Sequence, residues 1–204
     1  MTKLGFLVNL EMCSDHRGCM ISCKNAKNSP LGNYYIETFT AVDDAFPDVT
    51  TYFIPVMCQH CENPSCVGAC GASVFTKLPN GAVAVGDTSV CATCEDKPCL
   101  DACPYHAISL DKTTGRVGKC DMCLDRLAEG KPPACMENCF CGAIMFGDMD
   151  DPNSQISKMM GTFAPILHQL KPDSGNNPSV YYALSGKPWK ANMEGLYSPA
   201  WKDE

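Results

Sequence analysis

Short runs of apolar and β-branched residues, separated by turn-forming residues, recur along this chain and predict short secondary-structure elements. Residues 4–10, Leu-Gly-Phe-Leu-Val-Asn-Leu, predict a strand near the N-terminus. Residues 34–39 and 49–54 combine aromatic and β-branched side chains, and we expect them to form a hairpin whose turn lies around residues 43–48. The segment after position 19 predicts a short helix that ends near residues 28–30.

The middle of the chain carries shorter strand signals. The Asn80-Gly81 pair is a turn signal before a predicted strand at residues 82–85. Residues 108–110 and 115–118 predict a second small hairpin. Apolar runs such as residues 142–146 are only strand-sized, whereas a bilayer span needs about 18 apolar residues, so we expect no membrane-spanning helix.

The C-terminal quarter has a different pattern. Residues 155–170 predict one helix that is interrupted at Pro165. From position 171 the chain is rich in Pro, Gly and Asn, with scattered aromatic residues at Tyr181, Tyr182, Trp189, Tyr197 and Trp201. We expect such a tail to bury itself poorly and to wrap over a partner subunit, the alternative being that it covers a bound cofactor.

Composition narrows the range of functions. The 204 residues carry a formal net charge of −7, which argues against a nucleic-acid-binding protein with its usual basic surface. With 45% hydrophobic and 19% charged residues the chain is not disordered as a whole, and its length suits one large domain or two small ones. The sequence contains no glycine-rich phosphate loop, no His-Glu-x-x-His and no nucleophile elbow, so we expect no substrate chemistry in this chain.

Sixteen cysteines are the dominant chemical feature, and fifteen of them fall into four blocks. The blocks are Cys13, Cys19 and Cys23; Cys58, Cys61, Cys66 and Cys70; Cys91, Cys94, Cys99 and Cys103; and Cys120, Cys123, Cys135 and Cys139. Every block ends in Cys-x3-Cys, and the last three blocks begin with Cys-x2-Cys.

Three chemistries use cysteine this densely: disulfides, zinc sites and iron–sulfur clusters. Disulfides are disfavoured because cysteines so close in sequence are poor partners for one another, and because the N-terminus has neither a long apolar stretch nor a twin arginine to act as an export signal. Structural zinc sites use two separated cysteine pairs, which does not explain a recurrent Cys-x3-Cys. Ferredoxin-type clusters use three close cysteines and a further one that binds a different cluster. We therefore expect [4Fe–4S] clusters.

The second and third blocks form an internal repeat, displaced by 33 residues along the chain. Cys61-Glu-Asn-Pro-Ser-Cys66 parallels Cys94-Glu-Asp-Lys-Pro-Cys99. A repeat of this size is a supersecondary unit used twice. It predicts a ferredoxin-like fold, in which two similar halves each lend a cysteine to the other half's cluster.

The first block lacks one cysteine, and His16 stands where the spacing requires a ligand. Because imidazole ligates iron in Rieske centres, we expect His16 to be the sixteenth ligand of four clusters. Two alternatives stay open: a [3Fe–4S] cluster that lacks this corner, and ligation by Asp15, which breaks the spacing. We interpret Cys141, outside the blocks, as a small buried residue without a ligand role. The remaining histidines are interpreted as packing or surface residues: His60, His106 and His168.

The order of the blocks, the Cys123-x11-Cys135 step, Cys103-Pro104-Tyr105 and Lys119-Cys-Asp-Met-Cys123 resemble a known family. It is the iron–sulfur subunit of dimethyl-sulfoxide-reductase-family molybdopterin enzymes, with relatives among polysulfide, thiosulfate, tetrathionate and arsenate reductases and pyrogallol or catechol hydroxyl-transforming enzymes. The resemblance covers roughly residues 3–185. The chain departs from the family pattern at His16, and at Gly71 and Phe140, where proline usually follows the last cysteine of a block.

The resemblance implies that the first block pairs with the fourth and the second with the third. Cluster one would use Cys13, His16, Cys19 and Cys139; cluster two Cys58, Cys61, Cys66 and Cys103; cluster three Cys91, Cys94, Cys99 and Cys70; and cluster four Cys120, Cys123, Cys135 and Cys23. In the family this subunit conducts electrons, with cluster one nearest the catalytic subunit.

We therefore expect an α+β fold with two ferredoxin-like lobes that hold four [4Fe–4S] clusters. Residues 1–30 and 112–150 would carry clusters one and four, residues 55–111 clusters two and three, residues 31–54 a hairpin insertion, and residues 151–204 a C-terminal helix and partner-wrapping tail. The implied function is single-electron transfer between a molybdenum- or tungsten-containing molybdopterin subunit and either a quinol-linked membrane subunit or a soluble carrier. The alternative is a free-standing polyferredoxin. The sequence leaves the final compartment undetermined, because the family often exports this subunit folded together with a signal-bearing catalytic partner.

Overall fold

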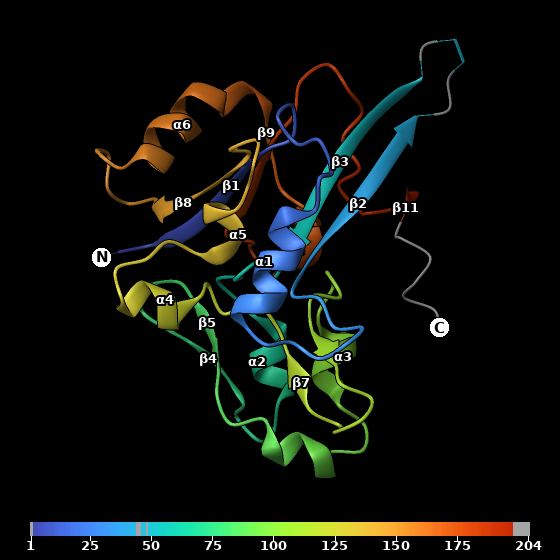
Figure 1. Cartoon of the computed structure of the whole chain (residues 1–204), viewed down its shortest axis with the longest axis vertical. Helices are drawn as coiled ribbons and strands as arrows, with labels where there is room; N and C mark the ends of the chain where they lie inside the picture. The colour runs from blue at the N-terminus through green and yellow to red at the C-terminus, as the bar shows by residue number, and fades with distance from the viewer. Residues whose placement is uncertain (1, 44–45, 48, 198–204) are drawn as a thin grey trace.

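The strand predicted near the N-terminus lies in the interior of a four-stranded sheet. The protein is described by a computed structural model that covers residues 2–43, 46–47 and 49–197. Strand β1 (Leu4–Asn9) lies between β8 (Ile144–Asp148), which is antiparallel to it, and β10 (Val180–Ala183), which is parallel to it. Strand β9 (Leu167–His168) pairs with β10 and completes the order β8-β1-β10-β9 (Figure 1).

Helix α6 (Gln155–Phe163) covers one face of this sheet (Figure 1). Leu7, Ile156 and Ala183 are buried together between the helix and the sheet. Phe6 and Tyr182 project from the opposite face into the main core, because successive side chains of a strand point to opposite sides. Burial on both faces explains why β1 is apolar along almost its whole length.

The helix predicted for residues 155–170 is shorter than expected. The Ser154 hydroxyl caps its N-terminus by accepting a hydrogen bond from the Ser157 amide at 3.2 Å. The helix ends at Phe163, and a 3-10 turn at Ala164–Ile166 leads directly into β9. Pro165 accounts for the difference, because proline has no backbone N–H to donate to the carbonyl four residues earlier.

The prediction that the segment from residue 171 buries itself poorly was wrong for residues 180–184. These residues form β10 and its extension, in which Val180, Tyr182, Ala183 and Leu184 are buried. The Tyr182 hydroxyl accepts a hydrogen bond from Gln59 Nε2 at 3.1 Å. Val180, Tyr181, Tyr182 and Ala183 form a strand because β1 offers them an unpaired edge. The average composition of the segment from residue 171 does not reveal this short apolar stretch.

Tyr182→Ala is expected to lower the free energy of unfolding by about 3–5 kcal/mol, because truncating a fully buried aromatic side chain leaves a cavity. The loss would be measured by denaturant titration of the iron-loaded protein under anaerobic conditions. Tyr197→Ala is the matched control, since Tyr197 is 75% exposed, and should change stability by less than about 0.5 kcal/mol. Equal losses for both variants would contradict the buried role of β10.

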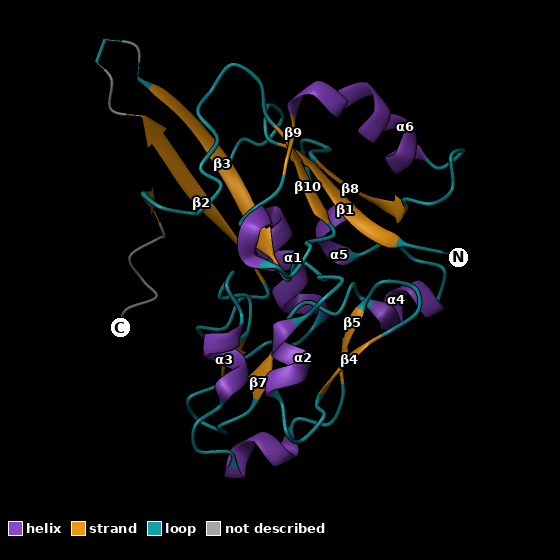
Figure 2. Cartoon of the chain, turned by 180° about the vertical axis from the view of Figure 1, so that it is seen from behind, coloured by secondary structure: helices purple, strands orange, loops and turns teal. Residues whose placement is uncertain are grey.

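The aromatic segments predicted to pair do so. Strands β2 (Ile36–Asp43) and β3 (Thr50–Met57) are antiparallel from Ile36 opposite Met57 to Asp43 opposite Thr50. Strand β11 (Leu196–Tyr197) joins the outer edge of β2. The far end of the β2–β3 pair projects away from the rest of the chain (Figure 2). The turn predicted around residues 43–48 lies partly outside the described residues. Trp201 lies outside them altogether.

Short elements form the remainder of the chain, around the cysteine blocks. Helices α1 (Gly18–Ala26) and α5 (Ala134–Glu137) pack against each other, and so do α2 (Ser65–Ala69) and α3 (Pro98–Ala102). Each of α2 and α3 is followed by a two-stranded hairpin, as the internal repeat requires. The hairpins are β4 (Phe75–Lys77) with β5 (Val83–Val85), and β6 (Ser109–Leu110) with β7 (Val117–Gly118).

A 3-10 helix at Ser89–Thr93 precedes α3, and α4 (Leu124–Ala128) precedes α5. None of the helices in the described part of the chain has both the length and the apolar character needed to cross a membrane.

Candidate metal centres

All sixteen cysteines are free of disulfides, and the structure gathers fifteen of them into four groups. The group that we name set two lines one cavity and consists of Cys58, Cys61, Cys66 and Cys103. Set three lines another cavity and consists of Cys70, Cys91, Cys94 and Cys99. Burial and the neighbouring thiols of set two raise the pKa of Cys61 to about 12.

Set four is the most deeply buried group and consists of Cys23, Cys120, Cys123 and Cys135. Burial and the nearby Cys123 thiol raise the pKa of Cys23 to about 12. The pKa values of Cys120 and Cys135 are raised well above the ordinary range, by burial first and then by the adjacent Cys23. Thiols that lie close together in a dry interior need a bound cation or cluster to be stable as thiolates.

Set one contains three cysteines, Cys13, Cys19 and Cys139, which line a single small cavity. His16 and Cys141 line the same cavity. Burial raises the pKa of Cys13 to about 11, and the thiols of Cys139 and Cys141 both contribute to the rise. The structure therefore places Cys141 among the cysteines of set one, which the sequence pattern did not indicate.

Each helix of the two packed pairs supplies cysteines to two sets. In α1, Cys19 belongs to set one and Cys23 to set four. Helix α5 carries Cys135 of set four, and Cys139 of set one follows it closely. In the other pair, α2 carries Cys66 of set two and ends at Cys70 of set three, and α3 carries Cys99 of set three and ends at Cys103 of set two. The recurrent Cys-x3-Cys spacing therefore bridges neighbouring sets.

The spacing of the sulfur atoms argues against single-ion sites. A zinc ion bound at about 2.3 Å draws its four ligand atoms to within about 4 Å of one another. Within the described residues, the one group of three or more potential ligands with such close spacing is Asp121, Cys123 and Asp125. Lys27 forms salt bridges with both of those aspartates. No three sulfur atoms of a cysteine set in the described part of the chain lie this close together, which suits a larger inorganic core.

Comparison with known proteins gives the same chemistry. Residues 49–149 match the family model of the 4Fe-4S dicluster domain. The chain is 31% identical to a tetrathionate reductase subunit of Salmonella typhimurium, over 98% of this chain and 80% of that protein. It is 34% identical to one of the chains of the anaerobic dimethyl sulfoxide reductase of Escherichia coli, over 88% of this chain and 90% of that protein. It is 28% identical to the arsenate respiratory reductase iron-sulfur subunit of a Shewanella species, over 90% of this chain and 97% of that protein.

This chain therefore belongs to the iron–sulfur subunits of dimethyl-sulfoxide-reductase-family enzymes. Subunits of this family transfer electrons and carry out no substrate chemistry of their own. The expectation that this chain is a non-catalytic electron-transfer subunit with a ferredoxin-like 4Fe-4S domain is therefore confirmed.

In this iron–sulfur subunit, both ring nitrogens of His16 face backbone amides. The Gly18 amide lies 3.0 Å from Nδ1, and the Phe140 amide lies 3.0 Å from Nε2. The Phe140 ring also meets the imidazole edge-on, with the ring centroids 5.8 Å apart. Asp15, the other ligand weighed from the sequence, forms a two-contact ion pair with Arg17 at 2.8 and 3.1 Å.

Lys119 is a functional candidate that the cysteine pattern did not indicate. Only 3% of its surface is exposed, it lines the cavity of set two, and its ammonium donates hydrogen bonds to the carbonyls of Val83 and Cys120. The ammonium also lies 5.5 Å from the centre of the Phe75 ring. Its charge offsets part of the rise in pKa that burial causes in Cys66 and Cys103. A lysine directly before a cysteine of a block is the sequence signal that marks it.

Lys119→Met is expected to lower the midpoint potential of the set-two cluster, because removing a buried positive charge disfavours the more negative, reduced state. Redox titration followed by electron paramagnetic resonance would measure the shift. Lys24→Met is the matched control: the Lys24 ammonium also binds carbonyls and lies over an aromatic ring, that of Tyr34. An unchanged midpoint potential of the set-two cluster in Lys119→Met would show that the lysine does not tune that cluster.

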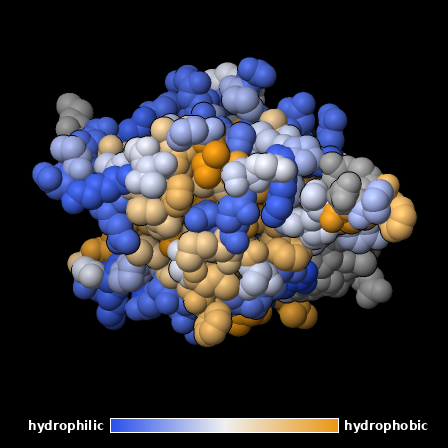
Figure 3. Space-filling model, turned by 90° about the horizontal axis from the view of Figure 1, so that it is seen from above, coloured by the Kyte–Doolittle hydropathy of each residue, from blue (hydrophilic) through white to orange (hydrophobic). Residues whose placement is uncertain are grey.

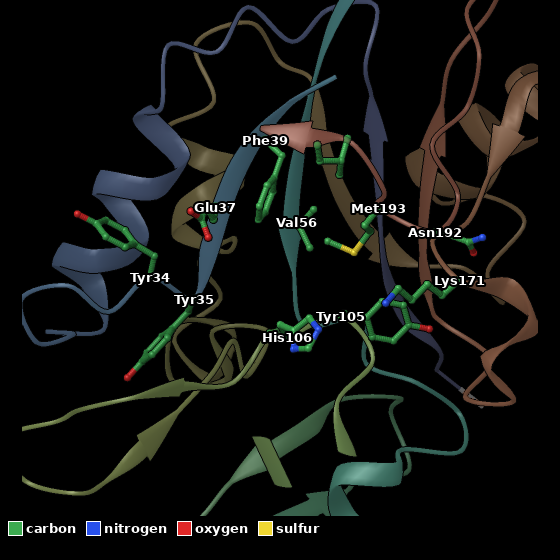
Figure 4. A pocket seen from close by; sticks show the side chains of 12 residues that line it. Tyr34, Tyr35, Glu37, Phe39, Val56, Tyr105, His106, Lys171, Asn192 and Met193 are labelled. Atoms are coloured by element: carbon green, nitrogen blue, oxygen red, sulfur yellow. The ribbon is translucent and has the colours of Figure 1, made fainter. Parts of the chain in front are cut away.

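The other histidines have the packing and surface positions expected of them. His60 is fully buried, its Nδ1 accepts a hydrogen bond from the Val83 amide at 3.0 Å, and burial holds its pKa well below the usual range. His168 stacks on Trp189 at 5.1 Å between centroids. His106 lines a cavity of about 490 Å³ that contains no cysteine, beside Tyr105 and below β2 and β3 (Figure 4).

Proposed function

We propose that this chain holds four [4Fe–4S] clusters and relays single electrons between a molybdopterin catalytic subunit and either a quinol-linked membrane subunit or a soluble carrier. Sets two, three and four each supply four thiolates. Set one supplies the thiolates of Cys13, Cys19 and Cys139. The block spacing indicates His16 as its fourth ligand, and Cys141 is a second candidate in the same cavity. When bound, such clusters supply reversible one-electron chemistry. The observation that carries the proposal is the convergence of cysteines from distant segments into four sets, three of which line single cavities.

The neighbour relations of the sets support one row in the order one, four, two, three. Sets one and four adjoin because Cys19 and Cys23 lie one turn apart on α1. Sets four and two adjoin because Lys119, which lines the cavity of set two, directly precedes Cys120 of set four. Sets two and three share the packed pair α2 and α3. A row of this kind has two ends, as a relay between two partners requires.

Exposed apolar side chains near set one support a partner at that end. Phe140 is 91% exposed, Ile21 61% and Met12 44%. Figure 3 views the molecule from above and shows apolar side chains exposed among polar ones on that side of the molecule. Large apolar side chains left in water near a redox site mark a docking surface. We assign the set-one end to the catalytic subunit.

Metal and sulfide analysis of the anaerobically purified protein tests the proposal. We expect about sixteen irons and sixteen acid-labile sulfides per chain, and copurification with a large molybdenum- or tungsten-containing subunit. About four zinc ions without sulfide would overturn the cluster assignment. A fully loaded monomer that associates with no such subunit would favour the free-standing polyferredoxin.

A further inference from the structure

Cys141 occupies a position from which its sulfur reaches the cavity of set one. The Gly142 amide donates a hydrogen bond to the Cys139 carbonyl at 2.9 Å, which closes a four-residue turn. Gly142 supplies the positive φ of 63° that follows this turn. Within the turn Phe140 points to solvent, whereas Cys139 and Cys141 both line the cavity. The turn thus presents two sulfurs to one site.

The Cys141 sulfur has a partner suited to a cluster thiolate. Its Sγ lies 3.0 Å from the hydroxyl oxygen of Ser14, the residue directly after Cys13. A hydroxyl donor to a metal-bound sulfur is one of the ordinary means by which proteins stabilise and tune iron–sulfur clusters. The side chain of Cys141 is half-buried, as are those of Cys13 and Cys139, so all three have similar access to the cavity.

His16 is arranged differently. A neutral imidazole has one nitrogen that accepts and one that donates, yet both nitrogens of His16 face backbone N–H groups at 3.0 Å. Only the unprotonated nitrogen can accept from its amide, and that same nitrogen would have to leave the amide in order to ligate iron. Residue 140 has an amide hydrogen because it is phenylalanine, whereas proline follows the corresponding cysteine, Cys103. The imidazole is thus placed to hold the turn that carries Cys139 and Cys141.

We propose that Cys141 is the fourth ligand of cluster one, and that His16 positions the Cys139–Gly142 turn instead of ligating iron. With Cys141 included, the sixteen cysteines of the chain supply sixteen thiolates, four to each cluster. The inference rests on the proposed function, since it presumes that set one holds a cluster. It adds a ligand that neither the block spacing nor the resemblance assigns.

The decisive measurement on the unmodified protein is pulsed paramagnetic resonance of cluster one for nitrogen hyperfine coupling. Ligation by Cys141 predicts no strongly coupled nitrogen and no three-iron signal in the oxidised, intact protein. A strongly coupled imidazole nitrogen would overturn the proposal in favour of His16. A stoichiometric three-iron signal in protein never exposed to oxygen would overturn it in favour of an incomplete cluster.

Paired variants give a second, independent test in the full-length protein. Cys141→Ala is expected to convert cluster one to a three-iron form or to lose it, with a loss of about one to four irons per chain. His16→Ala should keep the full iron content and shift the potential of cluster one only. Full iron content and an unchanged spectrum in Cys141→Ala would overturn the proposal. A wild-type protein that binds no iron at all would overturn the proposed function as well, so the two failures are distinguishable.

Discussion

Cys120→Ala is expected to remove one cluster and to interrupt electron transfer between the two ends of the chain. Cys120 is buried beside Cys23 and Cys135 of its own set and near Cys58 of set two. Alanine cannot ligate iron, so set four would keep only three of its four thiolates. Because set four lies between set one and set two in the proposed row, its loss separates the entry end from the remainder.

The measurements are iron and sulfide content, and turnover of the assembled complex driven through this chain. Iron should fall by roughly a quarter, and turnover should fall to background. Cys94→Ala is the matched control, because Cys94 belongs to set three at the far end of the row. Cys94→Ala should lose as much iron as Cys120→Ala does. The clusters of sets one, four and two should nevertheless still be reduced by electrons from the catalytic subunit. Equal reduction of all remaining clusters in both variants would contradict the proposed order.

Local sequence signals were sufficient for the elements that depend on local chemistry. The strand at residues 4–10 and the hairpin across residues 108–118 are present as β1 and as β6 with β7. The short helix after Cys19 is present as α1. In each case the signal is local: a run of apolar residues, two such runs close together, or a helix-ending segment. The same holds for the cysteine blocks, whose spacing is fixed by one helical turn.

Long-range contacts account for what the sequence concealed. Strand β10 exists because β1, more than 170 positions away, offers it a parallel edge. Lys119 is buried because two carbonyls, one of them from β5, accept its hydrogen bonds beside set two. Cys141 reaches set one through a turn whose geometry depends on Gly142. None of these three relationships has a period or a spacing in the sequence.

Iron removal is expected to unfold residues 58–123 while the sheet of β1, β8, β9 and β10 stays folded. The elements in residues 58–123 are too short to be stable alone: α2 and α3 have five residues each, and the two hairpins have strands of three and two residues. Their buried residues include the thiols of sets two and three. We therefore expect metal binding to supply most of the folding free energy of this region.

The four-stranded sheet has a core of its own. Leu7, Ile156 and Ala183 are buried between α6 and the sheet, in a cluster that contains no cysteine. Burying side chains of this size contributes about 1.5–3 kcal/mol each. Unfolding of the iron-free protein should therefore give a smaller melting transition than unfolding of the loaded protein, because only one part of the chain remains to melt.

Anaerobic chelation followed by limited trypsin digestion would measure this difference. Cleavage should appear first at Lys77, Arg116 and Lys119, which lie in the region whose buried thiols need the clusters, and last at Lys158 on α6. Loaded protein incubated without chelator is the control and should resist cleavage at the first three sites. Protection of those sites after complete iron loss, with an unchanged melting transition, would show that protein packing alone holds the cysteine region together.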